Sequence, residues 1–182
     1  GGGKTYSTVS SKGIKSVGNL VINDGEFVID SKDDAIHSNN YVGIVTGNIS
    51  ISSGDDGIHA DKEIIIDGGE IEIKQSYEGI ESEDITINGG DISVVSKDDG
   101  INISGGVDKS SVGGRPGENH MAGNGGLLHI TGGKVYVNSL GDGIDSNGKV
   151  IISGGEIIVD GPTNSGNGAL DYDSSFEVNG GE

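Results

Sequence analysis

Hydrophobic residues along this chain recur with a period close to 22 residues. Each period is marked by a small residue followed by Ile or Leu, which we call the anchor. The anchors are Ile14, Ile36, Ile58, Ile80, Ile101, Ile144 and Leu170. Successive anchors are 22, 22, 22, 21, 43 and 26 residues apart. Such a fixed period is typical of solenoids, in which each repeat buries its apolar face against its neighbours.

Each period contains two further apolar patches in which hydrophobic residues alternate with others. Ile64/Ile66 and Ile71/Ile73 are examples. This alternation is typical of strands with one buried face. The corner between the two patches is rich in glycine, which reaches positive φ without steric cost. The pattern predicts an all-β chain, a right-handed parallel β-helix (a single-stranded solenoid) of about seven turns of ~22 residues, with three short strands per turn.

The one long spacing, from Ile101 to Ile144, exceeds a turn by about the length of another turn. The excess lies between Ser104 and Gly126, and it contains no paired apolar positions. An extra turn would need such positions. We therefore predict a single β-helix domain over residues 1–182, with an inserted loop at about 104–126.

Composition supports an all-β fold and excludes several classes of function. Ile and Val together number 40 against 5 Leu, and β-branched residues favour strands over helices. No apolar run approaches the roughly 18 residues that a membrane span requires. The formal net charge of −18 would repel phosphate backbones, so we expect no nucleic-acid partner.

Acidic residues recur at one phase of the repeat, two and three positions before the anchors and one position after them. Stacked turns would bring neighbouring carboxylates about 5 Å apart, where each pair repels by roughly 3 kcal/mol at an effective dielectric constant near 20. Ca²⁺ would offset this repulsion, because it takes six to eight oxygen ligands. We therefore expect several Ca²⁺ ions along this edge; an acidic edge that is merely solvated is the alternative. The candidate ligands are Asp33, Asp34, Asp55, Asp56, Glu78, Glu81, Asp98, Asp99, Asp142, Asp145 and Asp171.

Two histidines, His37 and His59, occupy the same phase of adjacent turns. They could stack, bind a ligand or help to hold a transition metal. Two imidazoles alone make a poor metal site. We therefore expect an ordinary exposed pair.

Four segments resemble a known family. They are SGDDGIHADKEIIIDGGEIEI at 53–73, YEGIESEDITINGGDISV at 77–94, GGRPG at 113–117 and GPTNSGNGALDYD at 161–173. Together they resemble bacterial cell-surface proteins known as carbohydrate-binding domain-containing proteins. The resemblance implies a polysaccharide-lyase-like β-helix, several Ca²⁺ ions, an extracellular or cell-surface location, and affinity for polygalacturonate-type pectin and for cellulose. It also matches the Asp-Asp pairs, and Tyr77-Glu78 with Glu81, to the metal-binding edge of that family.

A calcium-dependent binder of acidic polysaccharide is the function we expect, and we predict no catalytic residue. A pectate-lyase-like β-elimination is an alternative, but lysines among carboxylates have raised pKa values, the wrong direction for a base. A calcium-stabilised surface filament is another alternative, and uncapped terminal turns favour end-to-end self-association. The residues we expect to contact sugar are Lys97, Arg115, His59 and Tyr77.

Overall fold

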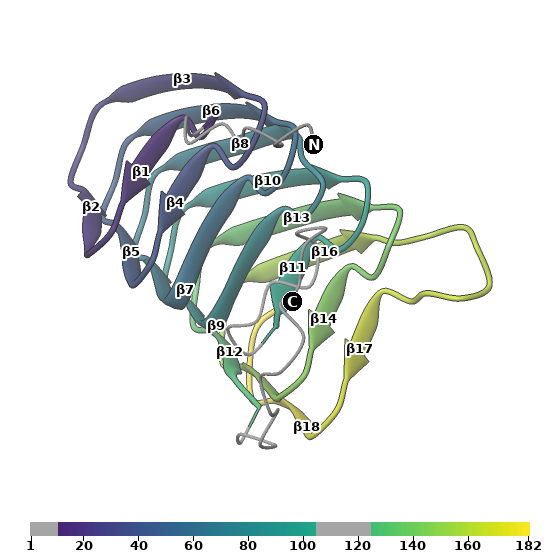
Figure 1. Cartoon of the computed structure of the whole chain (residues 1–182). Helices are drawn as coiled ribbons and strands as arrows, with labels where there is room; N and C mark the ends of the chain where they lie inside the picture. Colours follow the sequence, from purple (N-terminus) through teal and green to yellow (C-terminus); the bar gives the residue numbers. More distant parts are fainter. Residues whose placement is uncertain (1–10, 105–124) are drawn as a thin grey trace, which may run out of the picture.

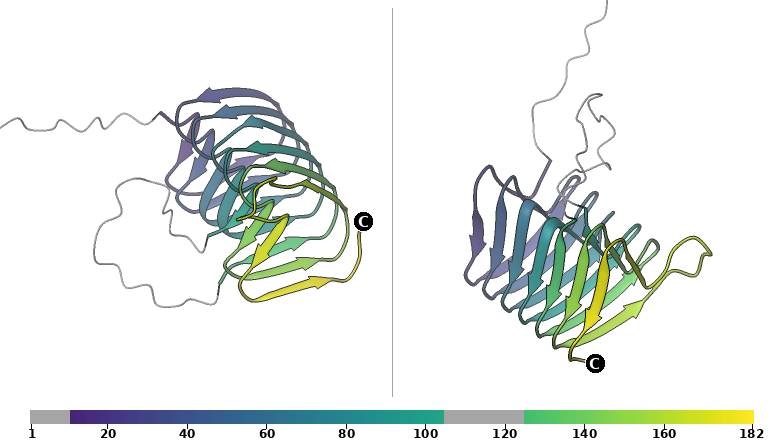
Figure 2. Two further views of the ribbon diagram at one scale, coloured as in Figure 1. Left: turned by 90° about the vertical axis from the view of Figure 1, so that its right-hand side faces the viewer. Right: turned by 90° about the horizontal axis from the view of Figure 1, so that it is seen from below.

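The chain winds into a parallel β-solenoid of seven turns, as the 22-residue period predicts (Figures 1 and 2). This computed structural model describes residues 11–104 and 125–182. Each strand pairs in parallel with its equivalents in the turns before and after it, as β4 does with β1 and β7. Positions one period apart in the sequence are therefore neighbours in space.

The strands occupy three positions around each turn. Those that begin at the anchors are β1 (Ile14–Ser16), β4 (Ile36–Ser38), β7 (Ile58–Ile66), β9 (Ile80–Ile87), β11 (Ile101–Ile103), β14 (Ile144–Ser146) and β17 (Leu170–Tyr172). Those of the second patch are β2 (Leu20–Ile22), β5 (Tyr41–Ile44), β12 (Leu127–Ile130), β15 (Lys149–Ile152) and β18 (Ser175–Val178). Those of the third patch are β3 (Glu26–Ser31), β6 (Asn48–Ser53), β8 (Glu70–Gln75), β10 (Asp91–Ser96), β13 (Lys134–Ser139) and β16 (Glu156–Asp160).

The first two positions merge into a single sheet, which the sequence pattern alone does not predict. Twelve strands form this sheet and six form the other. The merger occurs because β7 and β9 each run without interruption through both positions. The connecting residues Asp61-Lys62 and Glu83-Asp84 include no glycine or asparagine, whereas Asn39-Asn40 and Asn147-Gly148 break the equivalent path in other turns, as turn-forming residues do.

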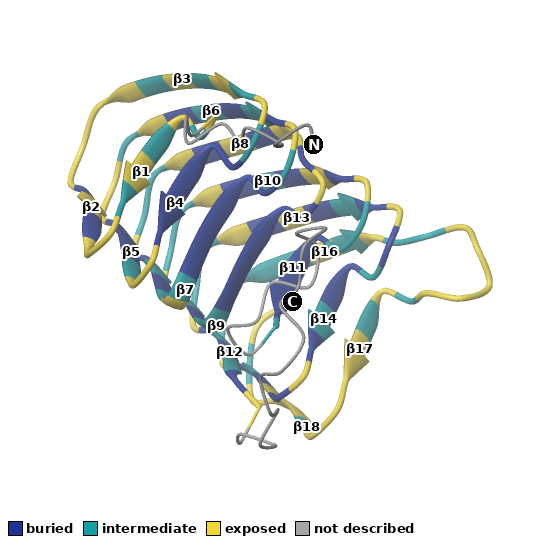
Figure 3. Cartoon of the chain, in the orientation of Figure 1, coloured by how far each residue is buried: buried dark blue, intermediate teal, exposed yellow. Residues whose placement is uncertain are grey.

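The core is a set of isoleucine rows that run along the solenoid axis. In the anchor row, Ile36 pairs with Ile58, Ile58 with Ile80 and Ile80 with Ile101. All four side chains are fully buried. Figure 3 shows β4 and most of β7 and β9 in the colour of buried residues, and the first three residues of each of these strands are buried. The alternation in the sequence thus selects the inward face correctly.

The corners before the third-patch strands depend on glycine. The residues at positive φ in the described chain are Gly25, Gly47, Gly69, Gly90, Gly133, Gly155 and Gly181, and no other residue type is among them. Five of the seven are the second glycine of a Gly-Gly pair, as expected for a tight corner. The first two turns use a single glycine instead.

The strands on either side of the long spacing both belong to the fifth turn. β11 pairs with the start of β9, and β12 pairs with its end, where Leu127 lies opposite Asp84. Residues 105–124, which make up most of the predicted insertion and include Arg115, lie outside the described residues.

A small residue before each anchor is required by close packing between turns. A Cβ added to Gly100 would lie 2.1 Å from Val137 Cγ1 and 2.6 Å from the carbonyl oxygen of Gly143. We expect Gly100→Ala to lower the free energy of unfolding by about 1–3 kcal/mol through overpacking. Gly18→Ala is the matched control, because nothing lies within 4 Å of its added Cβ. Urea denaturation compares the two variants, and equal stabilities would contradict this packing.

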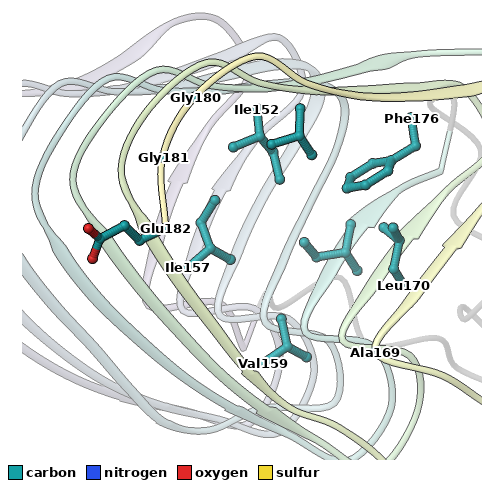
Figure 4. A pocket seen from close by; sticks show the side chains of 11 residues that line it. Ile152, Ile157, Val159, Ala169, Leu170, Phe176, Gly180, Gly181 and Glu182 are labelled. Carbon is teal, nitrogen blue, oxygen red and sulfur yellow. The ribbon is translucent and has the colours of Figure 1, made fainter.

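The core opens into a hollow at the last turns (Figure 4). Its lining is apolar and includes Ile152, Ile157, Val159, Leu170 and Phe176. Association end to end stays a prediction.

In the described part of the chain, no helix has the length and apolar character needed to span a membrane.

Candidate functional site

The acids before the anchors lie one above another along one edge of the solenoid, which we call the acidic edge. A ladder of backbone hydrogen bonds holds them in place. The amide of Gly57 donates to the carbonyl of Glu78 at 3.0 Å, and the amide of Gly79 donates to the carbonyl of Asp99 at 3.0 Å. The same bond recurs along the edge, so the row is Asp34, Asp56, Glu78, Asp99 and Asp142.

A second row runs beside the first, one position after each anchor. Strand register places its members opposite one another in the order Lys15, His37, His59, Glu81, Asn102, Asp145 and Asp171. The two rows together define the acidic edge. Their side chains divide it into three parts with different chemistry.

The first part carries its own cation. Lys12 forms ion pairs with Asp33, at 3.0 Å, and with Asp34. Burial alone would lower the pKa of Lys12, but its hydrogen bonds with these two carboxylates raise it. Asp55 lies close enough to both aspartates to share a cation with them. The Lys12 ammonium therefore already stands where the sequence predicts calcium.

The second part, which we call the histidine cluster, consists of His37, His59, Asp34, Asp56 and Glu81. His37 Nδ1 lies 2.7 Å from Asp34 Oδ2. His59 Nδ1 lies 3.0 Å from Asp56 Oδ2 and 2.9 Å from Glu81 Oε2. The two imidazole rings stack, with centroids 4.9 Å apart and planes at 16°. The expectation of an exposed histidine pair is wrong, because His37 and His59 are only 8% and 7% exposed.

The groups of the histidine cluster strongly shift one another's pKa values. Burial alone would lower the pKa of His59, but its contacts with Asp56 and Glu81 raise it to about 11. Burial and the adjacent Glu81 carboxylate raise the pKa of Asp56. For Asp34, burial opposes the change, yet hydrogen bonds with His37 and Lys12 hold its pKa well below the usual range. The cluster thus concentrates carboxylates around two imidazoles.

Glu78 and Asn102 border the histidine cluster. Asn102 Nδ2 donates to Glu78 Oε2 at 2.7 Å. Burial and the carboxylates of Glu81 and Asp56 raise the pKa of Glu78 to about 9. Two buried oxygens here, Asp56 Oδ1 and Asn102 Oδ1, have no hydrogen-bond partner among the described residues.

The third part, which we call the oxygen group, consists of Asp142, Asp145 and Asp171. Their carboxylate oxygens lie within 4.8 Å of one another. Burial raises the pKa of Asp145, and Asp142 and Asp171 raise it further. Asp142 and Asp145 are half-buried, and Asp171 is exposed. In the described chain no ion pair with a lysine or arginine reaches these three carboxylates.

Asp99 adjoins the oxygen group. It accepts a hydrogen bond from the Asp142 amide at 2.7 Å. Burial raises the pKa of Asp99 to about 7, and the nearby carboxylates of Asp98, Asp145 and Asp142 add to this effect. These aspartates therefore form a partly open site with uncompensated negative charge.

The residues expected to contact sugar are spread over different surroundings. Lys97 and Tyr77 are exposed, and the Asp98 carboxylate beside Tyr77 raises the pKa of its phenol to about 12. His59 instead lies inside the histidine cluster. Arg115 lies outside the described residues.

Sequence reasoning missed Lys12 and Asp61. Lys12 directly precedes the Gly13-Ile14 anchor pair, so it occupies the same phase as Asp34 and could have been found from the repeat. Asp61 Oδ1 lies 3.2 Å from His59 Nε2. It lies three residues after the anchor Ile58, and Glu83 and Asp173 occupy the equivalent position after Ile80 and Leu170, so the repeat offers a signal for it as well.

One family model matches this chain twice. The model, described as carbohydrate-binding domain-containing protein, matches residues 2–57 and 55–100. The two matches together cover more than half of the chain, including the Lys12 ion pairs and the histidine cluster. Searches of curated proteins and of solved structures gave no match.

Proposed function

Because the chain belongs to the family of carbohydrate-binding domain-containing proteins, we propose that it binds an acidic polysaccharide of the polygalacturonate type through calcium held at its acidic edge. Family membership supports a carbohydrate-binding role. Calcium and the acidic sugar are the proposed refinements. Such polysaccharides are extracellular, so the proposal implies that the protein works outside the cell or at its surface.

The observation that carries the proposal is the oxygen group. Its donors are carboxylate oxygens alone, which are the ligands that Ca²⁺ prefers. Burial raises the pKa of Asp145, and the neighbouring carboxylates of Asp142 and Asp171 raise it further. Asp142, Asp145 and Asp171 would hold the ion, and Asp99 lies beside them. When bound, calcium would supply positive charge at a partly exposed position.

Charge explains why a bridging cation is needed. The protein carries a formal net charge of −18, so a polyanion would be repelled by its surface. A calcium ion incompletely coordinated by protein oxygens can accept uronate oxygens as well. Neutral cellulose has less support, because aromatic residues, which commonly stack on sugar rings, make up only 4% of the chain.

A lyase function has less support than a carbohydrate-binding function. β-Elimination needs a basic residue that is neutral near the calcium. Burial alone would lower the pKa of Lys12, which pairs with Asp33 and Asp34 at the acidic edge, but its hydrogen bonds with these carboxylates raise it. This is the wrong direction for a general base.

The test is binding to polygalacturonate with calcium and with a chelator, by affinity electrophoresis or calorimetry. We expect binding with calcium and none with EGTA. Asp145→Asn keeps the size of the side chain but removes its charge, and should weaken binding at least tenfold. Asp91→Asn makes the same charge change at the exposed start of β10, so it should bind like the wild type.

Three outcomes would overturn the proposal. Binding that is unchanged by EGTA would contradict a calcium bridge between the protein and the polysaccharide. Equal losses in Asp145→Asn and Asp91→Asn would mean that net charge, and not the oxygen group, controls binding. Unsaturated uronate products, followed by their ultraviolet absorbance, would show an eliminase instead of a binding module.

A further inference from the structure

We propose that the histidine cluster binds a divalent transition-metal ion, with Zn²⁺ as the first choice. This site is separate from the oxygen group and from any calcium there. The histidine cluster differs from the oxygen group in ligand type, in burial and in position along the solenoid. The proposal does not depend on polysaccharide binding.

The geometry brings imidazole and carboxylate ligands together from three successive turns. His37 lies on β4, His59 on β7 and Glu81 on β9. The strand register places these three residues directly opposite one another. Rigid parallel strands therefore hold the ligands, which suits a preformed metal site.

Two overlapping sets of ligand atoms share His59. In one set, atoms of Asp34, His37 and His59 all lie within 4.8 Å of one another. In the other set, atoms of Asp56, His59 and Glu81 do so. All five residues are buried. The cluster thus offers two imidazoles and three carboxylates, more than the four ligands that zinc requires.

The ligand types select the metal. Imidazole nitrogen is a common ligand of zinc, copper and nickel, whereas calcium is bound by oxygen. The oxygen group contains no histidine, so the same solenoid edge presents two chemically distinct sites. Each imidazole also contacts a carboxylate, the arrangement that orients histidine ligands in zinc sites.

A buried oxygen without a partner points independently to a cation. Asp56 is 2% exposed. Its Oδ2 contacts His59, but its Oδ1 has no hydrogen-bond partner among the described residues. Leaving a buried charged acceptor unsatisfied is costly, and a metal ion in the cluster would satisfy it.

The surroundings supply excess negative charge to balance a dication. Glu78 and Asp61 add carboxylates next to the three of the cluster, and Asp61 lies 3.2 Å from His59 Nε2. Within residues 11–104 and 125–182, the lysine that pairs with the cluster is Lys12, which contacts Asp34. Asp56 and Glu81 are partnered instead by His59.

The experiment uses the untagged protein, stripped of metals with EDTA and then titrated with Zn²⁺ by calorimetry and with Co²⁺ by absorbance spectroscopy. We expect one tight site and visible Co²⁺ bands. His59→Gln should weaken Zn²⁺ binding at least about tenfold, since loss of an outer partner alone costs 10–100-fold. The control is His129→Gln, because His129 lies on β12, outside the histidine cluster, and its Nε2 forms a hydrogen bond with Ser153 Oγ.

A measurement on the wild type removes dependence on variants that fail to fold. In NMR spectra, Zn²⁺ should shift the imidazole resonances of His37 and His59 and leave those of His129 unchanged. Asp145→Asn should keep Zn²⁺ affinity, which separates this site from the calcium site. Unshifted His37 and His59 resonances, or equal Zn²⁺ affinity in wild type and folded His59→Gln, would overturn the proposal.

Discussion

Replacing Ile80 by alanine should lower the free energy of unfolding by about 2–5 kcal/mol. Ile80 is fully buried. It stacks between Ile58 in the turn before and Ile101 in the turn after. The substitution therefore leaves a cavity that borders two interfaces, and in a solenoid each turn is stabilised by its neighbours. The expected effect combines the lost hydrophobic transfer free energy of the removed side-chain atoms with the cost of the cavity that they leave.

The control for Ile80→Ala is Ile158→Ala. Ile158 lies on the outward face of β16 and is 51% exposed. Its truncation should change stability by no more than about 0.5 kcal/mol. Urea denaturation followed by circular dichroism measures both variants. Similar losses in the two would contradict the assignment of inward and outward faces.

Calcium should raise the melting temperature of the protein. An ion that binds only the native state stabilises it by mass action, by about 2.7 kcal/mol when its concentration is 100 times the dissociation constant. The oxygen group is built from two successive turns, by Asp142 and Asp145 around β14 and by Asp171 on β17, and Asp99 of the preceding turn adjoins it. Unfolding separates these residues, so the unfolded chain cannot bind in the same way.

The calcium effect is measured by differential scanning calorimetry. The protein is first freed of metals and then scanned with calcium or with EGTA. Asp145→Asn should lose most of the shift, while Asp91→Asn should keep it. Identical melting temperatures with calcium and with EGTA would contradict calcium binding by the oxygen group. A shift without polygalacturonate binding would give calcium a purely structural role.

The repeat in the sequence determined most of the architecture. In a solenoid, residues one period apart become neighbours in the next turn, so the spacing of the anchors already identifies Ile58, Ile80 and Ile101 as a stacked row. The same argument places His37, His59 and Glu81 in one row. Alternation within each patch identifies the buried face, because successive strand residues point to opposite sides.

Only the tertiary structure decided which partners surround each side chain of the acidic edge. The period shows which residues stack, but it does not show how deeply a side chain lies or which partner it reaches. His37 contacts Asp34 of its own turn, whereas His59 contacts both Asp56 of its own turn and Glu81 of the next turn. Lys12 reaches across to Asp34 in the following turn. Among the described residues, no lysine or arginine forms an ion pair with the oxygen group. Similar acidic positions therefore acquire different chemistry, since the free energy of a buried charge depends on the groups that surround it in space.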